Sequence, residues 1–181
     1  MDLSNYENEI TIARESSTPQ VKEIFDRSEQ VINKLLRTKT IDNPLVNLPI
    51  VTFDLTKECV AILKEMEPHV APTDNIYNLQ AAKLFNIVNN IQGYWGKLYT
   101  ASIVNKSGIP DNESVSKMLD LLKASMLEIT KLNLADDLKT ELNDKLKNLG
   151  IHKTLNSTPS GSGCMVVIAV LIMSVTLLTL I

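Results

Sequence analysis

Residues 18–37 read TPQVKEIFDRSEQVINKLLR and carry the clearest helical pattern in the chain. Their apolar residues recur every three or four positions, which places them on one face of an α-helix. These residues are Val21, Ile24, Phe25, Val31, Ile32, Leu35 and Leu36. Thr18 is suited to cap the helix, with Pro19 in its first turn. The stretch therefore predicts an amphipathic helix that packs against other helices.

The same spacing continues downstream of this helix. It predicts four more helices, over residues 55–67, 74–105, 111–129 and 134–149. No segment alternates polar and apolar residues between hairpin turns, as a β-protein would. We therefore expect an all-α fold, a bundle of four or five antiparallel helices.

Two segments depart from regular helical sequence. Residues 42–50, DNPLVNLPI, contain two prolines but are too apolar for a free linker, so we expect them to pack extended against the bundle. Within residues 74–105, Gly93 and Gly96 predict a kink or a local break in the long helix.

The composition of the 181-residue chain fits one modest domain. Its 18 Lys and Arg against 21 Asp and Glu give a net charge of -3, whereas a nucleic-acid-binding domain normally presents a basic face. Two cysteines, Cys59 and Cys164, cannot build a disulfide framework. We therefore expect no nucleic-acid partner.

The end of the chain, CMVVIAVLIMSVTLLTLI over residues 164–181, contains no charged side chain. A helix of that length is roughly 27 Å long, close to the hydrocarbon thickness of a thin bilayer. The segment predicts a single-pass C-terminal transmembrane helix. Lys145, Lys147 and Lys153 precede it, and this charge bias predicts that the domain faces the cytosol.

These patterns divide the chain into four parts. Residues 1–17 form an N-terminal extension, 18–151 the helical bundle, 152–163 a tether rich in Ser, Gly and Pro, and 164–181 the membrane segment. In an alternative, the hydrophobic end is cleaved and replaced by a glycolipid that anchors the protein at the cell surface. The N-terminus shows no basic start and no apolar run typical of a signal peptide, which favours the retained anchor.

Sequence motifs for catalysis are missing: there is no Gly-rich phosphate loop, no His-Glu-x-x-His and no Gly-x-Ser-x-Gly. His69 and His152 have no Cys or His at metal-ligand spacing. Cys59 has apolar neighbours at helical spacing, which predicts a packed thiol. Asp136 and Asp137 suit the first turn of a helix. We therefore expect neither an enzyme nor a metal or other cofactor.

An aromatic cluster remains as a candidate binding site. Tyr94, Trp95 and Tyr99, which include the only Trp, predict a groove wall or a partner-binding edge beside the two glycines. The alternative is an aromatic plug in the core. Cys164, at the membrane boundary, is either a site of reversible acylation or a passive thiol.

Together these features predict a non-enzymatic, membrane-anchored protein-interaction or adaptor module, with the lipid bilayer and a protein as partners. The alternative function is a lipid-anchored cell-surface bundle that binds an apolar ligand or surface.

Two families share parts of this layout. Trp95-Gly96-Lys97 resembles the Asn-Trp-Gly-Arg signature of Bcl-2-type apoptosis regulators, although Tyr94 stands in place of the Asn. The order of helices followed by a Ser/Gly segment is similar to fungal hydrophobic-surface-binding cell-wall proteins, a secreted family. The first resemblance implies an anchored protein-binding bundle and the second a surface protein. Neither assigns a site residue to this chain.

Overall fold

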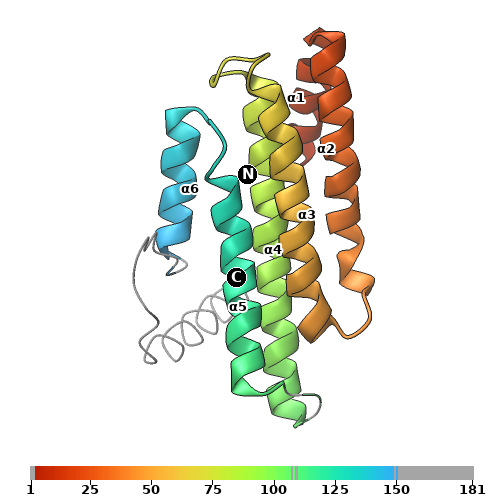
Figure 1. Ribbon diagram of the computed structural model, residues 1–181, viewed down its shortest axis with the longest axis vertical. Helices are drawn as coiled ribbons and strands as arrows, with labels where there is room; N and C mark the ends of the chain where they lie inside the picture. The colour runs from red at the N-terminus through yellow and green to blue at the C-terminus, as the bar shows by residue number, and fades with distance from the viewer. Residues whose placement is uncertain (1–2, 107, 109, 149, 151–181) are drawn as a thin grey trace.

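The computed structural model describes residues 3–106, 108, 110–148 and 150, and this part of the chain is all-α, as predicted. Six α-helices follow one another (Figure 1): α1 (Leu3–Ser16), α2 (Pro19–Arg37), α3 (Pro44–Met66), α4 (Asn75–Asn105), α5 (Asn112–Ile129) and α6 (Asp136–Asn148). A short 3-10 helix, η1 (Thr38–Thr40), follows α2. Helical periodicity predicted α2 to α6 but not α1, which lies within the predicted N-terminal extension.

Four long helices, α2 to α5, run up and down beside one another (Figure 1). α3 contacts α2, α4 and α5, while α1 lies against α4 and α2. We call the end where α2 and α4 begin the apical end, and the end where α3 and α5 begin the basal end. α6 stands beside α5 on the side of the bundle away from α1 (Figure 1).

One continuous hydrophobic core joins all six helices. Burial of each large apolar side chain stabilises the fold by about 1.5–3 kcal/mol, so this core is the main source of stability. α1 contributes Ile10 to it, and α6 contributes Leu142 and Leu146. The largest fully buried side chains are Trp95, Tyr77, Phe85, Ile32, Leu35, Leu48, Leu63, Met66, Ile76, Leu84, Ile91 and Leu122.

The predicted amphipathic helix over residues 18–37 is confirmed as α2. Six of its seven predicted core residues are buried, and Leu36 is 49% exposed. The Thr18 hydroxyl accepts a 3.4 Å hydrogen bond from the Val21 amide, and Pro19 occupies the first turn. Because Pro lacks an amide proton, it fits a turn whose amides have no partner within the helix.

The extended conformation predicted for residues 42–50 is wrong. α3 begins at Pro44 and continues through Pro49. Pro44 is tolerated because it lies in the first turn, and Asn43 precedes it in the left-handed region, with φ 48°. Pro49 cannot donate to the carbonyl of Leu45, four residues earlier. The Trp95 indole donates to that carbonyl instead, at 2.8 Å, so a tertiary contact satisfies the group that the proline leaves free.

The break predicted at Gly93 and Gly96 is also wrong, because α4 is a continuous α-helix across both positions. A β-carbon added at either glycine would meet no atom within 4 Å. The two glycines therefore neither interrupt the helix nor allow a close approach of another element.

Replacing Gly96 with Ala should therefore stabilise the protein by roughly 0.5–1 kcal/mol, because Ala loses less backbone entropy in a helix. Urea unfolding of the full chain measures this change. Gly108→Ala is the matched control and should destabilise, since Gly108 has a φ of 63° that Ala rarely adopts. A loss of stability in Gly96→Ala would mean that α4 is not regular there.

A hydrogen-bond network at the apical end fixes the connection to α6. The Tyr77 hydroxyl donates to the Glu67 carboxylate at 2.6 Å. The backbone amide of Asn133 donates to that carboxylate at 3.0 Å, and Ala135 donates to the Asn78 side-chain oxygen at 3.0 Å. The loop between α5 and α6 is therefore held to α4 and to the end of α3.

Among the described residues, none of the helices is both long and apolar enough to cross a membrane. The predicted tether over residues 152–163 and membrane segment over residues 164–181 lie outside the described residues, as do the predictions for Cys164 and His152.

Candidate interaction site

Trp95 is a core residue at the contact between α4 and α3. Its side chain is 1% exposed, and its indole donates the 2.8 Å hydrogen bond to the carbonyl of Leu45. The ring of Tyr99, one turn further along α4, stacks on it with 5.4 Å between centroids and 6° between planes. Trp95, the largest of the three predicted site residues, is therefore packed inside the protein and not accessible to a partner.

Tyr94 and Tyr99 are half-buried and flank Trp95 on different sides of α4. They are five positions apart in the sequence, so at 100° per residue they point about 140° apart. The Lys39 ammonium from η1 lies 6.0 Å from the centre of the Tyr94 ring. The three predicted site residues therefore do not form one wall, but each tyrosine keeps an accessible part.

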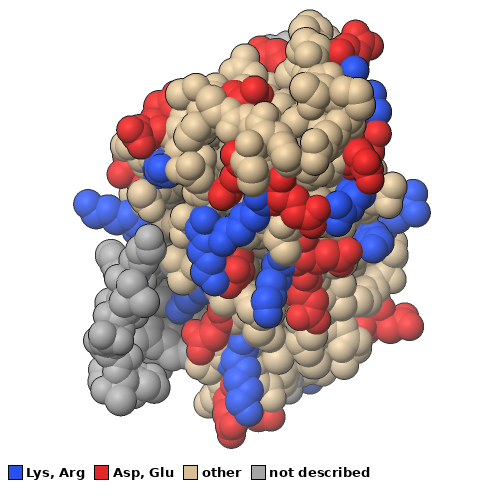
Figure 2. Space-filling view, turned by 45° about the horizontal axis from the view of Figure 1, so that its top comes forward, with Lys and Arg blue, Asp and Glu red and all other residues tan. Residues whose placement is uncertain are grey.

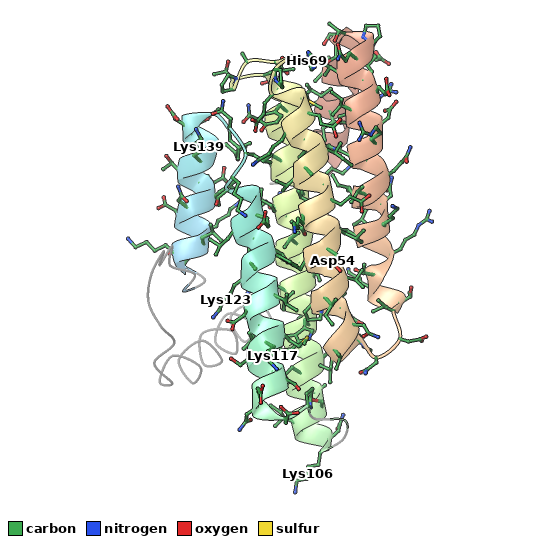
Figure 3. The ribbon with its side chains drawn as sticks, in the orientation of Figure 1. Asp54, His69, Lys106, Lys117, Lys123 and Lys139 are labelled. Carbon is green, nitrogen blue, oxygen red and sulfur yellow. The ribbon has the colours of Figure 1, made fainter. Side chains whose placement is uncertain are left out.

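Four exposed aliphatic side chains lie toward the same, basal end, on three different helices. Leu36 lies in the last turn of α2, Ile50 in the second turn of α3, and Ile103 and Val104 in the last turn of α4. Their exposed fractions are 49%, 39%, 43% and 74%. Figure 3 shows Lys106, the residue after α4, at this end, and His69 at the opposite end. We call these four residues, with the accessible parts of Tyr94 and Tyr99, the basal surface.

Sequence periodicity did not single out the aliphatic residues at the end of α4, and it assigned Leu36 to the apolar face of α2 rather than to a surface. Ile103 and Val104 fall outside the apolar stripe of the long helix, just before a turn sequence. The signal that could have indicated this surface was the presence of apolar residues outside the core-facing stripe at the end of a helix.

An open cleft of about 800 Å³ lies at the apical end. It is bounded by α1, the start of α2 and the turn between α3 and α4, and its apolar lining includes Ile12, Ala13, Val21 and Val70. Figure 2 shows a broad uncharged area on this end, while Lys, Arg, Asp and Glu mix along the helices. The sequence offered no signal for this cleft, because α1 lacks the helical apolar pattern.

The other titratable candidates have structural surroundings. Cys59 is fully buried, its thiol lies 3.9 Å from the Ser28 carbonyl, and burial raises its pKa to about 12. His69 is exposed, with its Nε2 3.2 Å from the Gln20 amide nitrogen. Asp136 and Asp137 lie in the first turn of α6. These positions show no nucleophile beside a base.

A polar layer joins α2 to the first turns of α4. The Gln80 amide donates to the Ser28 hydroxyl at 2.9 Å and to the Glu29 carboxylate at 2.8 Å. Lys83 pairs with Glu29 at 2.8 Å, with about a fifth of each side chain exposed. This layer has the character of a packed structural network, because its donors bond to side chains of the other helix, although the Gln80 Oε1 is buried without a hydrogen-bond partner.

Within the part of the chain that the structure describes, no group of three or more His, Cys, Asp or Glu side chains is placed to hold a metal ion. No family model matches the chain, and neither the curated proteins nor the solved structures include a match to it.

Proposed function

We propose that this protein is a non-enzymatic, membrane-anchored helical bundle that acts as a protein-interaction or adaptor module at a membrane surface. The uncharged residues 164–181 would anchor it in the bilayer, and the preceding lysines favour a domain that faces the cytosol. The basal surface would meet the partner.

The basal surface is the observation that carries the proposal. Isolated exposed aliphatic residues are ordinary on soluble proteins, whereas a contiguous apolar patch indicates a contact surface, so the proposal requires these residues to act together. Here three helices contribute exposed aliphatic side chains toward one end of the bundle, and α4 adds two half-buried tyrosines, whose apolar ring and polar hydroxyl suit an interface. Such surroundings fit a protein partner.

Membrane anchoring is tested with the full chain carrying an N-terminal fluorescent tag in a eukaryotic cell. We expect the full chain to stay with membranes in alkaline carbonate and a chain ending at residue 163 to be soluble. Protease added after selective permeabilisation of the plasma membrane should remove the tag. Carbonate extraction of the full chain would refute the anchor. Protection of the tag would favour the lipid-anchored cell-surface alternative.

Partner binding is tested by proximity labelling from the full chain. Val104→Asp places a charge on the basal surface and should remove the partner from the labelled set. Asn105→Asp is the matched control, since it adds the same charge one residue away without deleting an apolar side chain. Both positions are exposed, so both variants should fold. Identical labelled sets for wild type and Val104→Asp would refute the basal surface as a binding site.

A further inference from the structure

Little of α1 enters the core in the part whose side chains the structure describes, residues 8–16. Of its residues 8–16, only Ile10 is buried, and Ala13 packs partly against the core. Its sequence is rich in Asn, Ser, Thr and Glu, and its 14 residues are too few to form a stable helix alone in water. α1 is therefore helical because it is docked on α4 and α2.

An ion pair at the edge of the bundle holds α1 to α2. The Arg14 guanidinium donates to both carboxylate oxygens of Asp26, at 2.8 and 2.7 Å. The two side chains are 38% and 45% exposed, and exposed pairs of this kind contribute little to stability. The pair therefore orients α1 on α2 but contributes little to the free energy that keeps α1 docked.

The apical cleft shows that α1 fills only part of the recess in which it lies. The cleft runs beside Ile12 and Ala13 of α1 and reaches Val21 of α2. Ile12 itself is 68% exposed. A more apolar helix would bury more surface in the same place.

The helices beneath α1 pack without it. α3 contacts α2, α4 and α5, and α4 contacts α5. These contacts join α2 to α5 into one bundle without any contribution from α1. Removal of α1 would uncover an apolar groove between α2 and α4, with the Asp26 carboxylate at its rim.

We propose that α1 is a displaceable internal ligand, and that the α2–α4 groove binds an amphipathic helix of a partner protein. The recognised helix carries an aliphatic residue in the place of Ile10 and a basic residue four positions later, in the place of Arg14. The basic residue follows from charge complementarity, because Asp26 loses its partner when α1 leaves. This groove is separate from the basal surface, so the inference does not depend on the proposed function.

The test uses the full chain with Ile10→Asp, which should expel α1 because a buried unpaired charge is strongly unfavourable. The probe is a fluorescein-labelled synthetic peptide of residues 3–17. We expect the variant to unfold cooperatively, its α1 amides to exchange at least tenfold faster than in wild type, and the peptide to bind it at least tenfold more tightly. Wild type binds weakly because its own α1 occupies the groove.

Matched controls separate docking from general disturbance. Ile12→Asp makes the same change at an exposed position of the same helix and should behave as wild type in exchange and in peptide binding. A peptide carrying Ile10→Asp should bind the Ile10→Asp protein at least tenfold more weakly than the unmodified peptide. A peptide carrying Arg14→Ala should bind it up to about fivefold more weakly, as expected for the loss of an exposed ion pair.

Three results would overturn the inference. Loss of cooperative unfolding in Ile10→Asp would make α1 an integral core helix. Unchanged exchange of the α1 amides would show that Ile10 does not dock it. Equal peptide binding by wild type and Ile10→Asp would show that no groove is released. None of these results bears on Val104→Asp, so the proposed function stands or fails separately.

Discussion

Replacing Trp95 with Ala should lower the free energy of unfolding by about 3–5 kcal/mol, as expected for the loss of a buried Trp from a packed core. The residue is 1% exposed, stacks on Tyr99 and donates to the Leu45 carbonyl. Its removal leaves a cavity between α4 and α3 and a carbonyl without its donor. Urea unfolding followed by circular dichroism measures the change.

Tyr94→Ala is the appropriate comparison because Tyr94 is adjacent to Trp95 but only half-buried. It should lower stability by less than Trp95→Ala, since less apolar surface leaves the core. If Trp95→Ala lowered stability by about 1 kcal/mol or less, which is ordinary for a surface position, Trp95 would not be a core residue. It would then again be a candidate for contact with a partner.

The hydrogen bond to Leu45 can be isolated by combining two substitutions. Trp95→Phe keeps an apolar ring but leaves the Leu45 carbonyl without its donor, which costs about 1–3 kcal/mol. Pro49→Ala restores the backbone amide that normally bonds this carbonyl within a helix. The two changes should therefore couple, with Pro49→Ala stabilising Trp95→Phe by about 1 kcal/mol more than it stabilises wild type. Strict additivity would mean that Trp95 and Pro49 do not share this carbonyl.

These residues also show where prediction from sequence succeeds. Val21, Ile24 and Phe25 bury one face of α2 as their spacing predicted, because periodicity reports directly which side of a helix meets the core. Thr18 caps that helix for an equally local reason. In both cases the information lies within a few residues of the feature.

Prediction failed where a distant residue decided the outcome. Pro49 lies inside α3 because Trp95, remote in sequence, bonds the carbonyl that the proline leaves free. α1 is helical although its described part buries one aliphatic residue, since docking on α4 and α2 replaces the missing periodicity. The cleft and the basal surface arise from how helix ends meet. Spacing along one helix contains no information on that geometry.

Alkaline pH should destabilise the fold through Cys59. Burial raises the pKa of this thiol from its ordinary value of 9.0 to about 12, with a smaller contribution from the nearby carboxylates of Glu29 and Glu58. The folded protein therefore keeps the thiol neutral at pH values where the unfolded chain ionises it. The stabilisation is complete below about pH 9 and is lost as the pH rises towards 12.

The size of this loss follows from the two pKa values. Relative to neutral pH, the loss from Cys59 alone is roughly 1 kcal/mol at pH 10 and roughly 3 kcal/mol at pH 11. Tyr77 acts in the same direction at higher pH, because burial and its bond to Glu67 raise the pKa of the hydroxyl. Urea unfolding between pH 7 and pH 11 should therefore show stability falling more steeply above pH 10 than below it.

Cys59→Ala isolates the contribution of the Cys59 thiol to the pH dependence of stability. Every other group that titrates in this range, including Cys164, is present in both proteins. At pH 7 the variant should be about 1 kcal/mol less stable than wild type, because a buried atom is lost. Its stability should then fall less steeply with pH, so that the two curves cross near about pH 10 and the variant is the more stable protein beyond it.

Tyr77→Phe should change the slope only above the range in which Cys59 begins to act. Parallel curves for wild type and Cys59→Ala would show that Cys59 ionises as readily in the folded protein as in the unfolded chain, and would therefore contradict its position in the core between α2 and α3.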